Sequence, residues 1–150
     1  ARLYARLADG CPGRALNMER AGIFDRRGRV LQRLRGIPSA GSTLAAAEML
    51  EENRGRSLAE ARANHSSDLA LMAALYRDMA LIAHGADRSL LYNPDAADEL
   101  RLLADDLGGE KLCDLTLAIL DARSHIDGNI SPELAISSLL VELGRQQVSP

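Results

Sequence analysis

The stretch "DARSHIDGNISPELAISSLL", from Asp121 to Leu140, places a short polar segment between two strongly apolar helical patterns. Before it, apolar residues recur at intervals of three and four, which marks one face of a helix: Leu112, Leu115, Ile119, Ala122 and Ile126. After it, the same spacing returns: Ile136, Leu139, Leu140 and Leu143. Gly128, with Asn129 beside it, suits the end of the first helix, and Ser131-Pro132 suits the start of the second. The sequence therefore predicts two antiparallel helices joined by a tight connection, as in a helical bundle.

The rest of the chain repeats this helical spacing. The longest pattern begins at Ser57 and ends before Gly85, with its inner face at the following residues: Leu69, Met72, Tyr76, Met79 and Ala83. No stretch shows sustained two-residue alternation, so no sheet is expected. The predicted fold class is all-α, a helical bundle of about six or seven helices.

Glycine and proline mark the expected helix boundaries. Gly22 and Gly36 bound a basic helix, and Pro38-Ser39 follows as a break before the next one. That next helix is short, with an expected apolar face at Leu44, Ala47 and Leu50. Asn93-Pro94 suits a later helix start, with the Asn93 side chain as its cap.

The composition fits a helical domain without a membrane span. Hydrophobic residues make up 47% of the 150 residues, but aromatic residues are only 3% and Trp is absent. Such a core is built from Leu, Ile, Ala and Met, and Leu and Ala favour helices. No apolar run approaches the roughly 18 residues of a transmembrane helix, and no secretory signal opens the chain. Cys11 and Cys113 are far apart and are expected to be reduced cytosolic thiols.

Charge is divided unevenly along the chain. Residues 1–36 carry a formal net charge of +6 and the remaining residues carry −9. Arg26, Arg27 and Arg29 form the densest part of the basic segment and could contact phosphate, an acidic protein surface or only solvent. Aromatic residues for stacking on bases are missing apart from Phe24. A helical DNA-binding module is therefore one alternative function.

Sequence patterns for catalysis are sparse. No phosphate-binding loop of the form G-x-x-x-x-G-K-[ST] is present, and neither H-E-x-x-H nor G-x-S-x-G occurs. His65, His84 and His125 lack the Glu-x-x-His spacing of carboxylate-bridged metal sites in helical bundles. We therefore expect the histidines to lie at the surface or at its boundary, and we expect no catalytic residue, no metal and no cofactor in this fragment. An enzyme built on a helical bundle is an alternative function class.

Three segments, in this order, resemble motifs of one known family: "LADGCPGRAL" (Leu7–Leu16), "LYRDMALIAHGADRSLLYNPD" (Leu75–Asp95) and "ARSHIDGNISPELAISSLLVEL" (Ala122–Leu143). They resemble, in turn, the last helix of the AAA+ lid, the long collar helix and the final helix pair of delta-prime subunits of the bacterial DNA polymerase III clamp loader. The resemblance implies that residues 1–21 are the end of the lid and residues 22–150 are the helical collar. The related gamma/tau subunit has the same architecture and is the alternative.

The resemblance also bears on nucleotide sensing. In gamma/tau a lid arginine senses the bound nucleotide, and that position falls on Gly13 here, while Arg14 lies one residue later. One residue rotates a helical side chain by about 100°. The sensing function is therefore expected to be lost, as in delta-prime, and we expect this fragment neither to bind nor to hydrolyse ATP. Cys11 stands where the family usually has Ser.

The resemblance implies that the fragment serves assembly. Clamp-loader subunits associate through their collars into a pentamer, so the expected partners are gamma/tau and delta, with DNA and the sliding clamp reached only through the whole complex. The expected location is the cytoplasm. The fragment is expected not to be an enzyme, although its parent would be a subunit of a DNA-directed DNA polymerase whose nucleotide-binding module and zinc-binding cysteines lie upstream. Leu117, Leu120 and Val141 flank the inner stripes and are the predicted subunit interface.

Overall fold

The described part of the chain is helical throughout. The computed structural model describes residues 2–8, 11–13, 16–17, 22–40, 42–105 and 107–148, and none of these residues forms a strand. The elements are α1 (Arg2–Leu7), α3 (Ile23–Ala40), α4 (Ser42–Glu51), α5 (Leu58–Ala83), the 3-10 turns η1 (Arg88–Leu90) and η2 (Pro94–Ala96), α6 (Ala97–Ala104), α7 (Gly109–Asp127) and α8 (Pro132–Val148). The predicted all-α class is confirmed. Within this described part, no helix combines the length and the apolar character that a membrane crossing requires.

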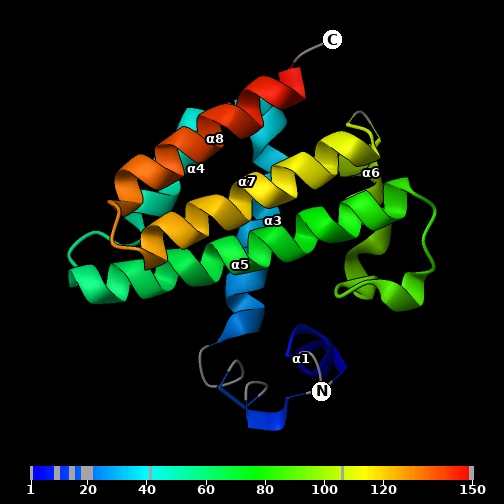
Figure 1. The fold of residues 1–150 in the computed structure, drawn as a ribbon, viewed down its shortest axis with the longest axis horizontal. Coiled ribbons are helices and arrows are strands. Elements are labelled where there is room, and N and C mark those ends of the chain that lie inside the picture. The colour runs from blue at the N-terminus through cyan, green and yellow to red at the C-terminus, as the bar shows by residue number, and fades with distance from the viewer. Residues whose placement is uncertain are drawn as a thin grey trace.

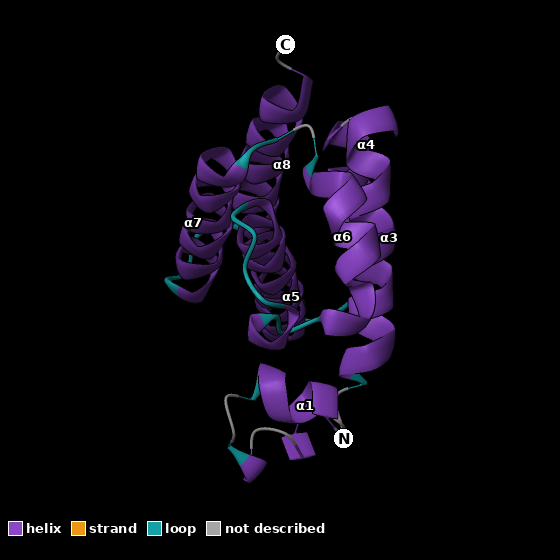
Figure 2. Cartoon of the chain, turned by 90° about the vertical axis from the view of Figure 1, so that its right-hand side faces the viewer, coloured by secondary structure: helices purple, strands orange, loops and turns teal. Residues whose placement is uncertain are grey.

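The helices of the bundle form two layers (Figure 2). One layer holds α5, α7 and α8, and the other holds α3, α4 and α6. The long helix α5 packs against α7, α6 and α3, which makes it the centre of the bundle, and α4 packs against α8. Figure 1 shows that α7 and α8 run in opposite directions, as predicted, and that α1 lies beyond one end of the bundle.

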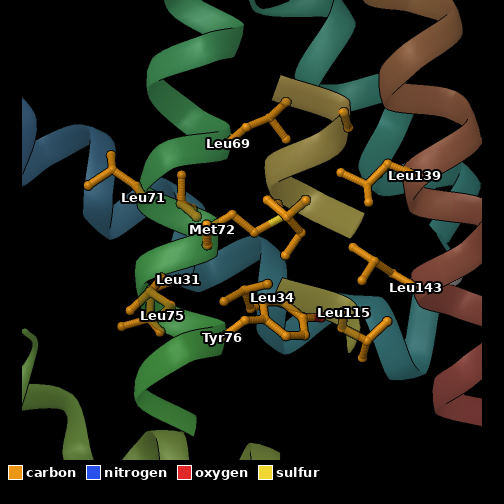
Figure 3. Close-up of a cluster of buried hydrophobic side chains, with 14 of the residues drawn as sticks. Leu31, Leu34, Leu69, Leu71, Met72, Leu75, Tyr76, Leu115, Leu139 and Leu143 are labelled. Carbon is orange, nitrogen blue, oxygen red and sulfur yellow. The ribbon is translucent and has the colours of Figure 1, made fainter. Parts of the chain in front are cut away.

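The core lies between the two layers and is built from aliphatic side chains. Leu31 and Leu34 of α3 meet Met72 and Tyr76 of α5 there, as Figure 3 shows. On the same close-up Leu115, Leu139 and Leu143 approach from α7 and α8. The inner stripes predicted for α7 and α8 are confirmed, because every residue expected in them is buried: Leu112, Leu115, Ile119, Ala122, Ile126, Ile136, Leu139, Leu140 and Leu143. Along α5, the four expected residues from Leu69 to Met79 are buried, but Ala83 at the helix end is exposed.

Local signals explain the ends of the long helices. Ser57 caps α5 in a capping box, since its side chain accepts from the Glu60 backbone while the Glu60 carboxylate accepts from the Ser57 backbone. Gly85, with φ +72°, follows the end of α5 in the left-handed conformation. After α7, Gly128 is the cap but keeps φ −84°, and Asn129 takes the left-handed φ of +72°. Asn tolerates this conformation better than other side chains do.

One predicted helix boundary and part of one predicted helix face are wrong. The basic helix does not end at Gly36, because α3 continues through Pro38 to Ala40. Proline removes one backbone hydrogen bond from a helix, but its φ is compatible with helical backbone. The predicted face of α4 is right only in part, because Leu50 packs against the core but Ala47 is exposed while Ala46 and Met49 are buried. The sequence of α4, "STLAAAEMLE", has apolar residues on several sides, so its spacing does not single out one face.

The connection between α5 and α6 is fixed by a buried carboxylate. Asp78 of α5 is fully buried, and it accepts hydrogen bonds from the backbone N–H groups of Tyr92 (3.0 Å) and Asn93 (2.7 Å). The Asn93 side chain donates a further bond to Asp78 at 2.9 Å and accepts one from Arg27 Nε at 2.7 Å. The predicted cap is therefore wrong: no side-chain hydrogen bond of Asn93 caps the following turn. The Asn93 side chain instead joins α5 to α3.

The same connection also meets the N-terminal helix. Arg6 of α1 donates from Nη1 to the backbone carbonyl of Leu91 at 2.6 Å, and Leu91 is buried. Leu7, at the end of α1, belongs to the same apolar core cluster as Ile23 at the start of α3. The position of α1 therefore depends on the connection that Asp78 holds.

A core truncation tests the stripe assignment. Leu115→Ala should lower the free energy of unfolding by about 2–5 kcal/mol, because it opens a cavity where α7 meets the core. Leu117→Ala, two residues away but 60% exposed, should change it by less than about 0.5 kcal/mol. Urea unfolding followed by circular dichroism measures both values, and equal losses in the two variants would contradict the assignment.

Removal of the buried carboxylate tests the connection. Asp78→Ala leaves the buried N–H groups of Tyr92 and Asn93 without an acceptor and should cost about 3 kcal/mol. Asp98→Ala is the matched control, because its side chain is 86% exposed beside Arg88 and such pairs contribute less than about 1 kcal/mol. Urea unfolding compares the two, and faster amide exchange at residues 91–93 in Asp78→Ala should show where the loss arises.

Candidate subunit-interface surface

Helices α7 and α8 present apolar side chains on their outer faces. The three residues predicted for the interface are all exposed: Leu117 by 60%, Leu120 by 41% and Val141 by 40%. Their exposure agrees with a place outside the inner stripes, whereas their role in binding stays a prediction. A side chain of this size facing solvent is available to a partner.

The three residues come from two helices that pack against each other, Leu117 and Leu120 from α7 and Val141 from α8. Leu120 precedes Arg123 by three residues, on the side of α7 where Arg123 Nε donates to Ser66 Oγ of α5 at 3.1 Å. Val141 belongs to α8, which packs on the other side of α7 from α5. Leu117 and Leu120 are three positions apart on α7 and are therefore neighbours on its surface.

Sequence reasoning missed two exposed apolar residues at the start of α8. Ile130 is 40% exposed and Leu134 is 64% exposed. They lie at one end of a groove of about 510 Å³ between α7 and α8, lined by Ala118, Asp121, Ala122, His125, Ile130, Leu134, Ala135, Ser138, Leu139 and Glu142. The sequence contained a signal for this exposure. Leu134 is apolar but lies outside the inner stripe that begins at Ile136, so it is expected on the outer side of the helix.

The predicted phosphate-contact residues have partners within the protein. Arg26 Nη1 lies 3.0 Å from Asp68 Oδ1, and Arg26 Nη2 donates to Asn64 Oδ1 at 2.8 Å. Arg27 is buried, and besides its bond to Asn93 its Nη2 lies 3.0 Å from Asp95. Arg29 is half exposed, with its Nε 4.0 Å from Glu52. Contact with phosphate stays a prediction, with Arg29 the most accessible of the three.

The remaining arginines of α3 also pair with acidic residues of the same chain. Arg33 is buried and pairs with Glu52, and its Nη1 lies 3.9 Å from Asp68 Oδ2. Arg35 pairs with Glu99 of α6. Each of the five arginines of α3 thus has an acidic partner between residues 52 and 99. Of the three alternatives for the basic segment, its contacts fit an acidic protein surface best. That surface belongs to the same chain.

A buried polar network surrounds these pairs. Asn64 donates to Asn53 Oδ1 at 2.8 Å, and Asn53 Nδ2 lies 3.3 Å from the Met49 carbonyl and 3.5 Å from His65 Nδ1. His65 is 2% exposed, so the expectation of a surface or boundary histidine is wrong for this residue. Burial lowers the pKa of His65, with Arg33 and Arg26 adding to the effect against Asp68. Burial raises the pKa of Asp68, and the same two arginines oppose that rise.

The network borders a second hollow. A cavity of about 720 Å³ is lined by Ala47, Leu50, Glu51, Asn53, Arg54, Gly55, Leu58, Ala61, His65, Ser131, Pro132 and Glu133. Over the residues that the structure describes, no three His, Cys, Asp or Glu side chains group together as a metal site would require. The other two histidines, His84 and His125, are exposed.

The predicted nucleotide-sensing position is described only in part. Gly13 is exposed and has no side chain to reach a nucleotide, and a Cβ added there would meet nothing within 4 Å. Arg14 lies outside the described residues. The loss of sensing and the lid assignment of residues 1–21 remain predictions.

The pH dependence of stability tests the burial of His65. Its folded pKa lies below the ordinary value of 6.5, so below that pH the unfolded chain takes up a proton that the folded chain takes up less readily. The free energy of unfolding should therefore fall as the pH drops below 6.5, and His65→Gln should reduce this fall. Both proteins keep Asp68, so their difference isolates the histidine. Urea unfolding between pH 8 and pH 5 gives the comparison, and the exposed His125→Gln variant should retain the wild-type slope.

Comparison with known proteins identifies the family. The sequence model of the family described as "DNA polymerase III, delta subunit, C terminal" matches residues 24–145, from the first turn of α3 to near the end of α8. No curated protein and no solved structure matches the chain. The match spans most of the chain and nearly all of the two-layered bundle, which makes this chain a member of the family of C-terminal domains of DNA polymerase III delta subunits, a clamp-loader-related protein.

Proposed function

We propose that this chain is the collar of a delta-prime-type clamp-loader subunit and that it joins this subunit to the collars of gamma/tau and delta. The family match over residues 24–145 carries the clamp-loader role, whereas the delta-prime type rests on the resemblance of the three sequence segments. In this proposal residues 1–21 are the end of the AAA+ lid, and the protein works in the cytoplasm, reaching DNA and the sliding clamp only through the assembled loader. The chain itself performs no catalysis.

Gly13 supports a delta-prime type over gamma/tau. It occupies the position of the nucleotide-sensing arginine in the aligned motif, and it is exposed without a side chain. The guanidinium group of arginine can form two parallel hydrogen bonds to a phosphate, and glycine has no side chain that could do so.

The exposed residues of α7 and α8 support a role in assembly. Leu117, Leu120 and Val141 stand on helices whose opposite faces already fill the core. Exposed apolar side chains next to a rigid, fully packed face are what a helix offers to a second protein. The alternative of a DNA-binding module has less support, because the arginines of α3 are paired with acidic residues of the same chain.

Charge substitutions on the outer faces test this role. Leu117→Asp and Val141→Asp should leave the thermal melt near that of the wild type, because both side chains are substantially exposed. They should weaken association with gamma/tau and delta by about tenfold, equal to about 1.4 kcal/mol, because a charge has to be desolvated at the contact. Pull-downs and analytical ultracentrifugation with the reconstituted loader subunits measure the association.

Leu102→Asp is the matched control, since Leu102 is 74% exposed on α6, in the other layer of the bundle. It should assemble normally. Unfolding of the two test variants would place their residues in the core, and normal assembly by both would remove them from the interface.

A further inference from the structure

The cavity of about 720 Å³ lies where two helix connections meet. The connection between α4 and α5 and the connection between α7 and α8 are at the same end of the bundle (Figure 1). The first contributes Asn53, Arg54 and Gly55 to the lining, and the second contributes Ser131, directly before α8 begins at Pro132. Small-molecule sites have volumes of about 300–1,000 Å³. The cavity is therefore large enough for a small organic molecule.

Two buried polar side chains line this cavity. His65 is 2% exposed and Asn53 is 8% exposed. The amide of Asn53 has a fixed direction, because its Oδ1 accepts from Asn64 at 2.8 Å and its Nδ2 faces the Met49 carbonyl, which requires a donor, at 3.3 Å. The same Nδ2 lies 3.5 Å from His65 Nδ1. Since an amide nitrogen only donates, Nδ1 of His65 is the acceptor of this contact.

The other ring nitrogen of His65 is consequently a donor. Burial lowers the pKa of His65 below its ordinary value of 6.5, so the ring is predominantly neutral at pH 7. A neutral imidazole carries one proton, and this proton lies on Nε2 because Nδ1 accepts. Among the residues that the structure describes, none accepts a hydrogen bond from Nε2. A buried N–H without an acceptor is unfavourable, so the cavity favours an occupant with an acceptor oxygen.

The charge around the cavity disfavours an anionic occupant. Arg54 is paired with Glu51 at 2.9 Å, and Glu133 adds a negative charge from α8. Behind His65, the arginines of α3 are balanced by their acidic partners. A carboxylate or a phosphate would meet a net negative rim, whereas a neutral carbonyl oxygen would not. The acceptor group that fits this cavity is therefore neutral.

The walls of the cavity are apolar. Ala47 and Leu50 line it from α4, and Leu58 and Ala61 line it from α5. Leu58 is 62% exposed, so it has apolar surface that an occupant can remove from water. A short aliphatic chain matches these walls, and a branched end fits between small and large side chains.

We propose that this cavity binds a small neutral molecule with a carbonyl group at one end and a branched aliphatic chain at the other. The carbonyl oxygen accepts a hydrogen bond from His65 Nε2, and the aliphatic chain packs on Leu50 and Leu58. The lining includes none of Leu117, Leu120 and Val141, so this binding is separate from the proposed assembly surface. A bound molecule contacts both helix connections and stabilises the folded chain by mass action.

Three probes with one carbon skeleton test the chemistry of the ligand. Isocaproamide has a neutral carbonyl, isocaproate has a charged carboxylate, and isohexylammonium has no acceptor. Titration of each into the protein, followed by amide NMR signals, should shift Asn53, Gly55 and Ser131, and isocaproamide should bind at least about tenfold more tightly than the other two. It should also raise the Tm most. Equal binding of the three probes, or no binding of isocaproamide, overturns the proposal.

Two leucine variants locate the binding. Ala61→Leu fills the cavity from a half-buried position and should weaken isocaproamide at least about tenfold. Ala63→Leu is the matched control, because Ala63 is exposed on the same helix and does not line the cavity, and it should bind as the wild type does. Unchanged binding in Ala61→Leu overturns the proposal.

The histidine itself is tested by its donor. His65→Leu removes the N–H and should bring the affinities for isocaproamide and isohexylammonium to within about twofold of each other. If this variant does not fold, nitrogen NMR of the wild-type ring decides instead. Nε2 should carry the proton, and its signal should move when isocaproamide binds. A ring protonated on Nδ1, or an Nε2 signal that does not respond to the probe, overturns the proposal.

Discussion

The arrangement of this bundle depends on the ion pairs between α3 and the acidic residues that follow it in sequence. Arg26 and Arg33 share Asp68 on α5, Arg33 also meets Glu52, and Arg27 reaches Asp95. The pairs with Asp68 are largely buried on both sides, and breaking a buried pair of this kind leaves an uncompensated charge and costs about 3–5 kcal/mol. Their effect is therefore to specify one placement of α3 across α5, because a shift along either helix would separate several charges at once.

The unequal charge of the two parts of the sequence acquires a physical meaning from these contacts. A +6 segment followed by a −9 remainder suggested two parts with different neighbours. The structure shows that the arginines of α3 have the later part of the same chain as their neighbour, and that Arg27, through Asn93 and Asp78, extends this contact to the connection before α6. Since Arg6 of α1 binds the carbonyl of Leu91 in that connection, the N-terminal helix is positioned through the same set of polar contacts.

The helices were predictable where their residues differ sharply between faces, and unpredictable where structure depends on distant partners. The stripes of α7 and α8 follow from local spacing, and all their expected core residues are buried. In α4, by contrast, apolar residues on several sides hid the true face at Ala46 and Met49. Asn93 was predicted to be a cap because Asn directly before Pro94 is typical of a helix start. Its side-chain amide instead donates to the buried Asp78, fifteen residues earlier, at 2.9 Å. The exposure of Leu117, Leu120 and Val141 followed from the stripes, whereas the groove near Leu134 required the relative placement of two helices.

The internal pairing of α3 also determines where this protein can meet others. A basic helix with free arginines would compete for phosphate and acidic surfaces, but here most of its guanidinium groups are engaged, and Arg27 and Arg33 are buried. The acidic partners of these arginines are Glu52, Asp68, Asp95 and Glu99, and their charge is largely compensated by α3. The exposed apolar side chains of α7 and α8 lie away from this internal pairing, and they favour that side of the bundle for recognition.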